Sequence, residues 1–542
     1  MWQQIYTPVA ASLGLSALAA ALPIVTLVYT LGVRRMPSWK ASLIGLAAAE
    51  LIALFIYRMP VLMSLGAITY GAAFGLFPIG WIVYWAIVLY RITLETGQFE
   101  IVKNSIGNLT PDRRLQALLI AFAFGAFMEG ACGFGTPVAV AAAMLTGLGF
   151  SPFYAAAICL LANTAPVAFG SVGLPLVTLS GITGISLVTL SSNVGRICAP
   201  ISLVIPAYLM LVMGGWRALK AVFPAVLVCG VTFAGTQLFV SNVIGPYLTD
   251  ILGSVVAMAA LIILLQFWKP RQVSEGSAQN LAAPVNAPPH STREVLIAWA
   301  PYALLVVFVL VWGLNAVKAG LDFFTITIPW PALHNHVQRI PPVVAKAAPY
   351  AAVYTFNWLS ISGTACMFAA LLSCVVLRMS PHLALRLLLA TLRQLLHPLV
   401  TIAAIVGLAF LMNYCGATAT LGLAFAASAV FFPFFSPLLG WLGVFLTGSD
   451  TASNALFGNL QVVTANRLGL NPALMAAANS SGGVMGKMIS LQSIAVAGAA
   501  TEMKPEEEGR LFRFTLRHSI LLASLIGLIT LLYAYLLPHW VK

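Results

Sequence analysis

Apolar runs of about 20 residues recur along this chain almost to its end, and no other feature constrains its fold as strongly. Three of them are LGLSALAAALPIVTLVYTLGV (residues 13–33), VLIAWAPYALLVVFVLVW (295–312) and HSILLASLIGLITLLYAYLL (518–537). About 20 apolar residues are the length that a helix needs to cross the hydrocarbon core of a bilayer. The chain is therefore predicted to be an all-α polytopic membrane protein with about 12–14 transmembrane helices.

The composition fits a membrane environment. Only 8% of the 542 residues are charged, against about 25% in an ordinary soluble domain. The excess of Lys and Arg over Asp and Glu gives a net charge of +13, and in short loops Lys and Arg collect on the cytoplasmic side of a membrane. We therefore attribute the excess of positive charge to the orientation of the protein in the lipid membrane, and we expect no nucleic-acid partner. The seven cysteines form no C-x-x-C pair, so we expect no disulfide framework, metal site or cofactor.

The chain divides into two predicted halves, residues 1–268 and 343–542. Between them, residues 269–294 are rich in Pro, Ser, Asn and Gln and are predicted to form a flexible hydrophilic loop. Residues 295–342 are predicted to be a linker helix followed by a non-spanning segment, because IPWPALHNHVQRIPP (328–342) is broken by prolines.

The halves repeat each other. GAFMEGACGFGTPVAV (125–140) matches GVFLTGSDTASNALFG (443–458), and NTAPVAFG (163–170) matches NSSGGVMG (479–486). These glycine-rich stretches predict a hairpin or broken helix within residues 115–180 and another within residues 436–500. Paired interruptions at corresponding places in two halves are the best sequence indication of a binding site in a secondary transporter.

Few charged residues are expected at membrane depth: Glu50, Glu129, Asp450 and Lys487, with Arg196 near a boundary. Two of these five, Glu129 and Asp450, lie in the matched stretches, and Lys487 directly follows one of them. A charge at the bilayer centre costs about 2.5–3.5 kcal/mol on insertion scales, so such residues usually face a cavity or a partner. The pattern favours a functional site at the breaks.

Three residues are candidates for proton coupling: Glu129, Asp450 and His397. A desolvated carboxylate favours its neutral form and can load and release a proton. Each candidate also has a structural alternative. Glu129 could cap a broken helix or pair with a cation, Asp450 could cap the following helix, and His397 could stabilise a proline kink.

The groups expected to bind a substrate are the small and hydrogen-bonding residues at the breaks, where helix N-termini would add N–H donors. Lys487 could attract an anionic substrate or pair with a buried acid. GGVMGKM (482–488) is no phosphate loop, since Met follows the lysine where Ser or Thr is required. The predicted substrate-binding residues are Gly130, Gly133, Thr136, Asn163, Thr164, Ser449, Thr451, Asn479, Ser480, Ser481 and Lys487.

Four long segments, EGACGFGTPVA, NTAPVAFG, GWLGVFLTGSDTASNALF and GGVMGKMISLQSIAVA, resemble those of the bacterial L-lactate permease family. This resemblance implies proton-coupled uptake of L-lactate, with D-lactate and glycolate as further substrates, across the bacterial inner membrane. It also implies a fold like that of the ion-transporter superfamily, with inverted repeats and re-entrant hairpins whose Asn-Ser/Thr tips contact a carboxylate.

Other interpretations stay open. The chain could be a symporter of another small carboxylate, or a carboxylate anion channel without proton coupling. An enzyme is not expected, because the sequence has no H-E-x-x-H and only one histidine well inside an apolar stretch. The acid that carries the proton, the stoichiometry, the type of motion and the oligomeric state are undetermined, a homodimer being one option.

Overall fold

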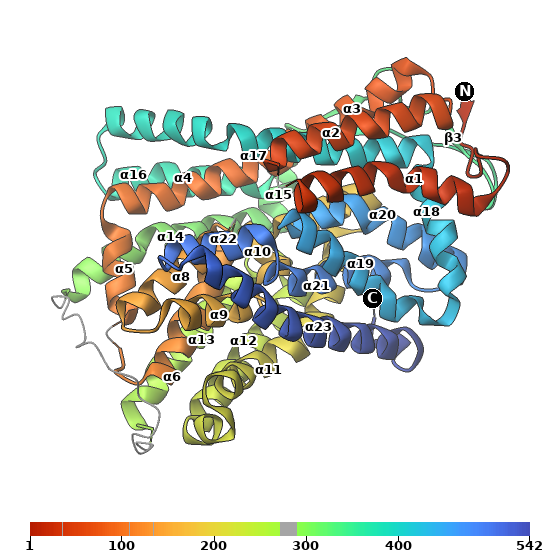
Figure 1. Ribbon diagram of the computed structural model, residues 1–542. Coiled ribbons are helices and arrows are strands. Elements are labelled where there is room, and N and C mark those ends of the chain that lie inside the picture. Colours follow the sequence, from red (N-terminus) through yellow and green to blue (C-terminus); the bar gives the residue numbers. More distant parts are fainter. Residues whose placement is uncertain (35, 108, 134, 271–289, 542) are drawn as a thin grey trace.

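The computed structural model describes residues 1–34, 36–107, 109–133, 135–270 and 290–541. Within these ranges, 12 helices are long and apolar enough to cross a membrane, or 13 if the bent pair Pro152–Ala162 and Val167–Thr183 is one span. The prediction of an all-α polytopic membrane protein is confirmed, as is the expected number of helices. Figure 1 shows the arrangement of the helices.

The first half of the chain contains the helices α1 (Leu13–Val28), α2 (Ser38–Leu51), α3 (Val61–Phe74), α4 (Trp81–Glu95), α5 (Gln98–Gly107), α6 (Arg113–Gln116), α7 (Gly125–Ala131), α8 (Thr136–Gly147), α9 (Pro152–Ala162), α10 (Gly170–Thr183), α11 (Leu187–Ala221), α12 (Phe223–Val243) and α13 (Thr249–Phe267). Shorter π or 3-10 segments are η1 (Tyr29–Val33), η2 (Ile52–Ile56), η3 (Gly75–Gly80), η4 (Ala117–Phe124) and η5 (Val167–Phe169).

The rest of the chain contains α14 (Thr292–Gly313), α15 (Asn315–Asp322), α16 (Ser362–Val376), α17 (Pro381–Cys415), α18 (Ala417–Phe425), η6 (Ala426–Phe431), α19 (Phe432–Thr447), α20 (Asp450–Leu468), α21 (Pro472–Lys487), α22 (Leu491–Ala500), α23 (Pro505–Tyr535) and η7 (Pro538–Trp540). The short strands are β1 (Trp2–Gln3), β2 (Ile326–Pro329), β3 (Val337–Arg339), β4 (Ala348–Pro349) and β5 (Val353–Phe356).

The region between the halves is only partly described. The predicted loop 269–294 falls largely on residues 271–289, which lie outside the described residues. The predicted linker helix corresponds to α14, which is long enough to span a membrane. The segment after it, up to residue 342, forms α15 and strands β2 and β3. β3 pairs with β1 at the N-terminus and with β4, and β2 pairs with β5.

One layer of the molecule joins segments far apart in sequence. Helices α1 to α4 lie with α16 and α17 along the top of Figure 1, where α17 packs on α2 and α3 and α16 packs on α4. Small residues allow this packing, since a β-carbon on Gly71 of α3 would lie 2.7 Å from the carbonyl oxygen of Val406 on α17.

The helices beneath this layer are interrupted. α7 ends at Ala131 and α8 begins at Thr136, with Gly133 (φ 59°) and Gly135 (φ 82°) between them in backbone conformations that favour glycine. The α9–α10 pair bends by 65°. In the second half, α19 ends at Thr447 just before α20, and α21 ends at Lys487 just before α22.

The sequence interpretation misplaced one break. Residues 479–486, NSSGGVMG, lie inside α21 and not at an interruption. Their glycines serve a close helix crossing: a β-carbon on Gly482 would lie 2.0 Å from the carbonyl oxygen of Pro437 on α19. Every residue of α21 after Pro472 is buried, so this helix forms part of the centre of the protein.

Candidate functional site

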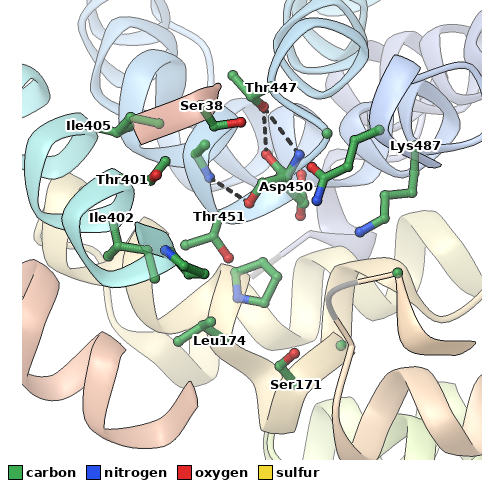
Figure 2. A pocket seen from close by; sticks show the side chains of 18 of the residues that line it. Ser38, Ser171, Leu174, Thr401, Ile402, Ile405, Thr447, Asp450, Thr451 and Lys487 are labelled. Atoms are coloured by element: carbon green, nitrogen blue, oxygen red, sulfur yellow. Dashed lines mark hydrogen bonds between the residues drawn. The ribbon is translucent and has the colours of Figure 1, made fainter. Parts of the chain in front are cut away.

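A cavity of about 330 Å³ lies between the α2–α17 layer and the interrupted helices (Figure 2). This volume falls in the range of small-molecule sites. Helices α2 and α17 line one side, and α7, α10, α20, α21 and α22 contribute to the other. The polar and charged lining residues are Ser38, Ser42, Glu129, Ser171, His397, Thr401, Thr447, Ser449, Asp450, Thr451, Lys487, Gln492 and Ser493.

Several helices begin at the cavity, among them α8, α20 and α22. α20 contributes Ser449 and Thr451 at its N-terminus, α22 contributes Gln492 in its first turn, and Gly135 precedes the first residue of α8. The first turn of a helix carries N–H groups without intrahelical acceptors and a partial positive charge. These three N-termini therefore favour a small anion in the cavity.

Asp450 lies in the first turn of α20 and is 3% exposed. Its Oδ2 accepts hydrogen bonds from Ser480 Oγ at 2.6 Å and Asn454 Nδ2 at 3.4 Å, while its Oδ1 is buried without a hydrogen-bond partner among the described residues. The N-cap of α20 is Ser449, whose Oγ accepts from the Ala452 N–H at 3.3 Å. One carboxylate oxygen of Asp450 is thus hydrogen-bonded, and the other has no partner among the described residues.

Lys487 is the last residue of α21 and is 7% exposed. In Figure 2 its side chain extends into the same space that Asp450 and Thr451 reach from α20 and that Ser171 bounds from α10. None of the described carboxylates lies within 4.0 Å of its ammonium group, although its charge acts on Asp450 through space. The lysine is therefore available to a bound anion.

Glu129 occupies the last turn of α7 and is 3% exposed. Its Oε2 accepts from Asn163 Nδ2 at 3.0 Å. No described Lys, Arg or His forms an ion pair with it within 4.0 Å. A β-carbon on Gly170 would lie 2.7 Å from its Oε1, so glycine at this position leaves room for the carboxylate.

His397 also borders the cavity, from α17. It is exposed, and its ring centroid lies 5.3 Å from that of Trp39 on α2. α17 continues as one helix through Pro398. The histidine therefore sits at the contact between α2 and α17, across the cavity from the interrupted helices.

The cavity brings together six of the predicted site residues: Glu129, His397, Ser449, Asp450, Thr451 and Lys487. Among the described residues, its lining does not include Gly130, Gly133, Thr136, Asn163, Thr164, Asn479, Ser480 or Ser481. Several of these support the lining residues instead, as Asn163 bonds to Glu129 and Ser480 bonds to Asp450.

Asn479 shows why some of the predicted residues do not line the cavity. It is fully buried in α21, where its Oδ1 accepts from Gln461 Nε2 at 3.1 Å and its Nδ2 donates to Asn454 Oδ1 at 3.0 Å. Asn454 in turn contacts Asp450. The polar side chains of residues 479–486 are therefore hydrogen-bonded to neighbouring residues and do not line the cavity themselves.

Sequence reasoning missed several residues that line or adjoin the cavity. The neutral residues Ser38, Ser42 and Thr401, from the α2–α17 layer, carry no charge or break that would mark them. Gln492 could have been predicted, because it lies in the segment GGVMGKMISLQSIAVA that carries the family resemblance. A further buried acid, Asp250, was absent from the predicted charges at membrane depth.

Comparisons with known proteins show which family this chain resembles over nearly its whole length. The model of the family "L-lactate permease" matches residues 16–537. An L-lactate permease of Bacillus subtilis is 45% identical over 99% of this chain and 100% of its own length. The glycolate permease GlcA of Escherichia coli is 44% identical over 98% of each chain. The solved YdaH transporter of Alcanivorax borkumensis aligns over 86% of each chain with 15% identity and a TM-score of 0.46.

Proposed function

Because the chain belongs to the L-lactate permease family, we propose that it carries L-lactate into the bacterial cell together with a proton. The chain is a multi-pass membrane transporter rather than an enzyme. The names of its relatives support L-lactate and glycolate as substrates across the inner membrane. D-lactate, the mirror image with the same functional groups, belongs to the same proposed range.

The carboxylate of lactate binds at Lys487, beside the N-termini of α20 and α22. An ammonium group without an ion-pair partner, and free N–H groups at two helix starts, all favour a negative group at one place. The hydroxyl group of the substrate bonds to Ser449 or Thr451 at the start of α20. A 2-hydroxy acid needs both kinds of contact.

The charges around the cavity support proton coupling, and this observation carries the proposal. With each side chain counted in its charged form, Glu129 and Asp450 bring two negative charges to the cavity and Lys487 brings one positive charge. Entry of a lactate anion alone would leave the cavity with a net charge of two negative units, which is costly in a poorly solvated place. One proton entering with each lactate restores the original charge.

Glu129 is the acid better suited to carry the proton. Asp450 lies at a helix N-terminus, whose partial positive charge favours a carboxylate, and its Oδ2 accepts two hydrogen bonds. Glu129 lies at a helix C-terminus, where the helix dipole opposes a negative charge, and accepts one hydrogen bond. His397 is a more exposed candidate for passing protons between Glu129 and solvent.

The test is transport of labelled L-lactate into proteoliposomes that contain the purified protein. With one proton per lactate, an inward gradient of one pH unit without membrane potential drives about a tenfold accumulation. Collapse of the gradient by a protonophore should abolish it. Uptake that follows voltage and ignores the pH gradient would identify an anion channel. A panel of unlabelled 2-hydroxy acids as competitors would rank the substrates.

A further inference from the structure

A buried carboxylate that the transport scheme above does not use lies beside Glu129. Asp250 occupies the first turn of α13 and is 1% exposed. Both of its carboxylate oxygens are buried, and neither has a hydrogen-bond partner among the described residues. An ionised carboxylate without donors is costly to hold away from water. A bound proton or a nearby cation would therefore stabilise Asp250.

Glycine brings α7 and α13 close together at this point. A β-carbon on Gly130, the residue after Glu129, would lie 2.9 Å from Cβ of Asp250 and 3.0 Å from Cγ1 of Ile251. The carboxylates of Glu129 and Asp250 consequently interact electrostatically. Two acids that share a buried site cannot both ionise at low cost, and their protonation is a property of the pair.

The described elements packed against α13 bring no positively charged side chain to Asp250. The main elements packed against α13 are α7, α12 and η4. α7 contributes Glu129, α12 contributes only Cys229 as a titratable residue, and η4 contributes none. Cys198, on α11, also interacts electrostatically with Asp250. Lys, Arg and His are absent from α7, α12 and η4, and no described cation lies within 4.0 Å of Asp250.

A proton supplies the hydrogen-bond donor that the side-chain oxygens of Asp250 and Asn163 lack. Asn163 donates its Nδ2 hydrogen to Glu129, but its Oδ1 is buried without a donor among the described residues. Together with the two oxygens of Asp250, this makes three buried acceptors and no donor for them. Protonation of one carboxyl adds an O–H donor and removes one of the two neighbouring charges.

We propose that Glu129 and Asp250 share the transported proton, so that Asp250 is a second proton-coupling residue. The proton moves within the pair as the O–H bond of one carboxyl breaks and that of the other forms, and the charge of the pair is unchanged by this step. Glu129 exchanges the proton with the cavity, and Asp250 holds it away from the substrate. This inference rests on the proposed proton-coupled transport.

The test is the substitution Asp250→Asn, which keeps the size of the side chain and removes its acid. In proteoliposomes with an inward gradient of one pH unit, we expect accumulation of labelled L-lactate to fall from about tenfold to the level without a gradient. Exchange of internal for external lactate at equal pH should continue, since it requires binding and movement of the loaded protein only. Asp322→Asn, at an exposed position, is the matched control and should behave like wild type.

Other outcomes separate this inference from the proposed function. Wild-type protein that does not follow the pH gradient would overturn both. Wild type that follows the gradient, with Asp250→Asn doing the same, would overturn this inference alone. Loss of both accumulation and exchange in a folded variant would also overturn it, since Asp250 would then serve binding or structure.

A second measurement applies should Asp250→Asn fail to fold. The Glu129→Gln variant leaves Asp250 as the acid of the pair, and infrared spectroscopy detects a protonated carboxylic acid by its C=O band. We expect such a band, shifted by addition of L-lactate, in the Glu129→Gln protein in liposomes. A spectrum without a protonated carboxylic acid that responds to lactate would refute the shared proton.

Discussion

Replacement of Lys487 by methionine is the sharpest test of the anion site. Met keeps much of the buried aliphatic stem and removes the charge. Because Lys487 makes no ion pair within 4.0 Å with the described carboxylates, its removal breaks no salt bridge. A hydrogen bond to a charged group contributes about 1.5–3 kcal/mol. Since 1.4 kcal/mol is tenfold in affinity, we expect lactate to bind about 10- to 150-fold more weakly.

The assay is lactate binding to the purified protein by isothermal titration calorimetry, with thermal unfolding measured in parallel. Lys346→Met, at an exposed position, is the matched control and should leave binding unchanged. Lys487→Arg keeps the charge but not the shape, so it should recover part of the affinity. Wild-type affinity in Lys487→Met, accompanied by a lower unfolding temperature, would refute the anion-site reasoning and identify a structural lysine.

Three further predictions follow from the same contacts. Glu129→Gln should abolish lactate accumulation driven by a pH gradient and leave exchange partly intact, measured in proteoliposomes; equal loss of both would contradict its role as proton carrier. Asn479→Ala should lower stability by about 1–3 kcal/mol, because Gln461 loses an acceptor, with little change in lactate affinity; a large loss of affinity at unchanged stability would place Asn479 in the binding site. Gly482→Ala should destabilise the protein by about 1–3 kcal/mol through the clash with Pro437, and an unchanged unfolding temperature would show that α19 and α21 separate easily.

The sequence predicted the helical fold and the Glu, Asp and Lys residues of the cavity for one physical reason: burial in a membrane makes charges and chain breaks rare and therefore informative. Glu129, Asp450 and Lys487 all line the cavity. The contribution of α2 and α17 was beyond sequence reasoning, because hydroxyl groups such as that of Thr401 are common in membrane helices and only the packing of distant segments shows which ones face a cavity.

The misplaced break in the second half has a similar cause. Glycine marks both chain interruptions and close helix crossings, and these differ only in what lies opposite. At Gly133 the backbone is left-handed and α7 ends nearby. At Gly482 the backbone is helical and the carbonyl of Pro437 lies within reach of any β-carbon. Sequence spacing alone cannot separate the two cases.

The two halves also differ in what they present, although their sequences repeat. The first half brings together two buried acids, Glu129 in the last turn of α7 and Asp250 in the first turn of α13, and a proton is the ligand that we propose for this pair. The second half presents Lys487 with the N-termini of α20 and α22, where an anion is the natural ligand. Substitutions in the first half should therefore change the coupling between pH gradient and uptake, whereas those in the second half should change lactate affinity. A variant of Lys487 that altered coupling while leaving affinity unchanged would contradict this division.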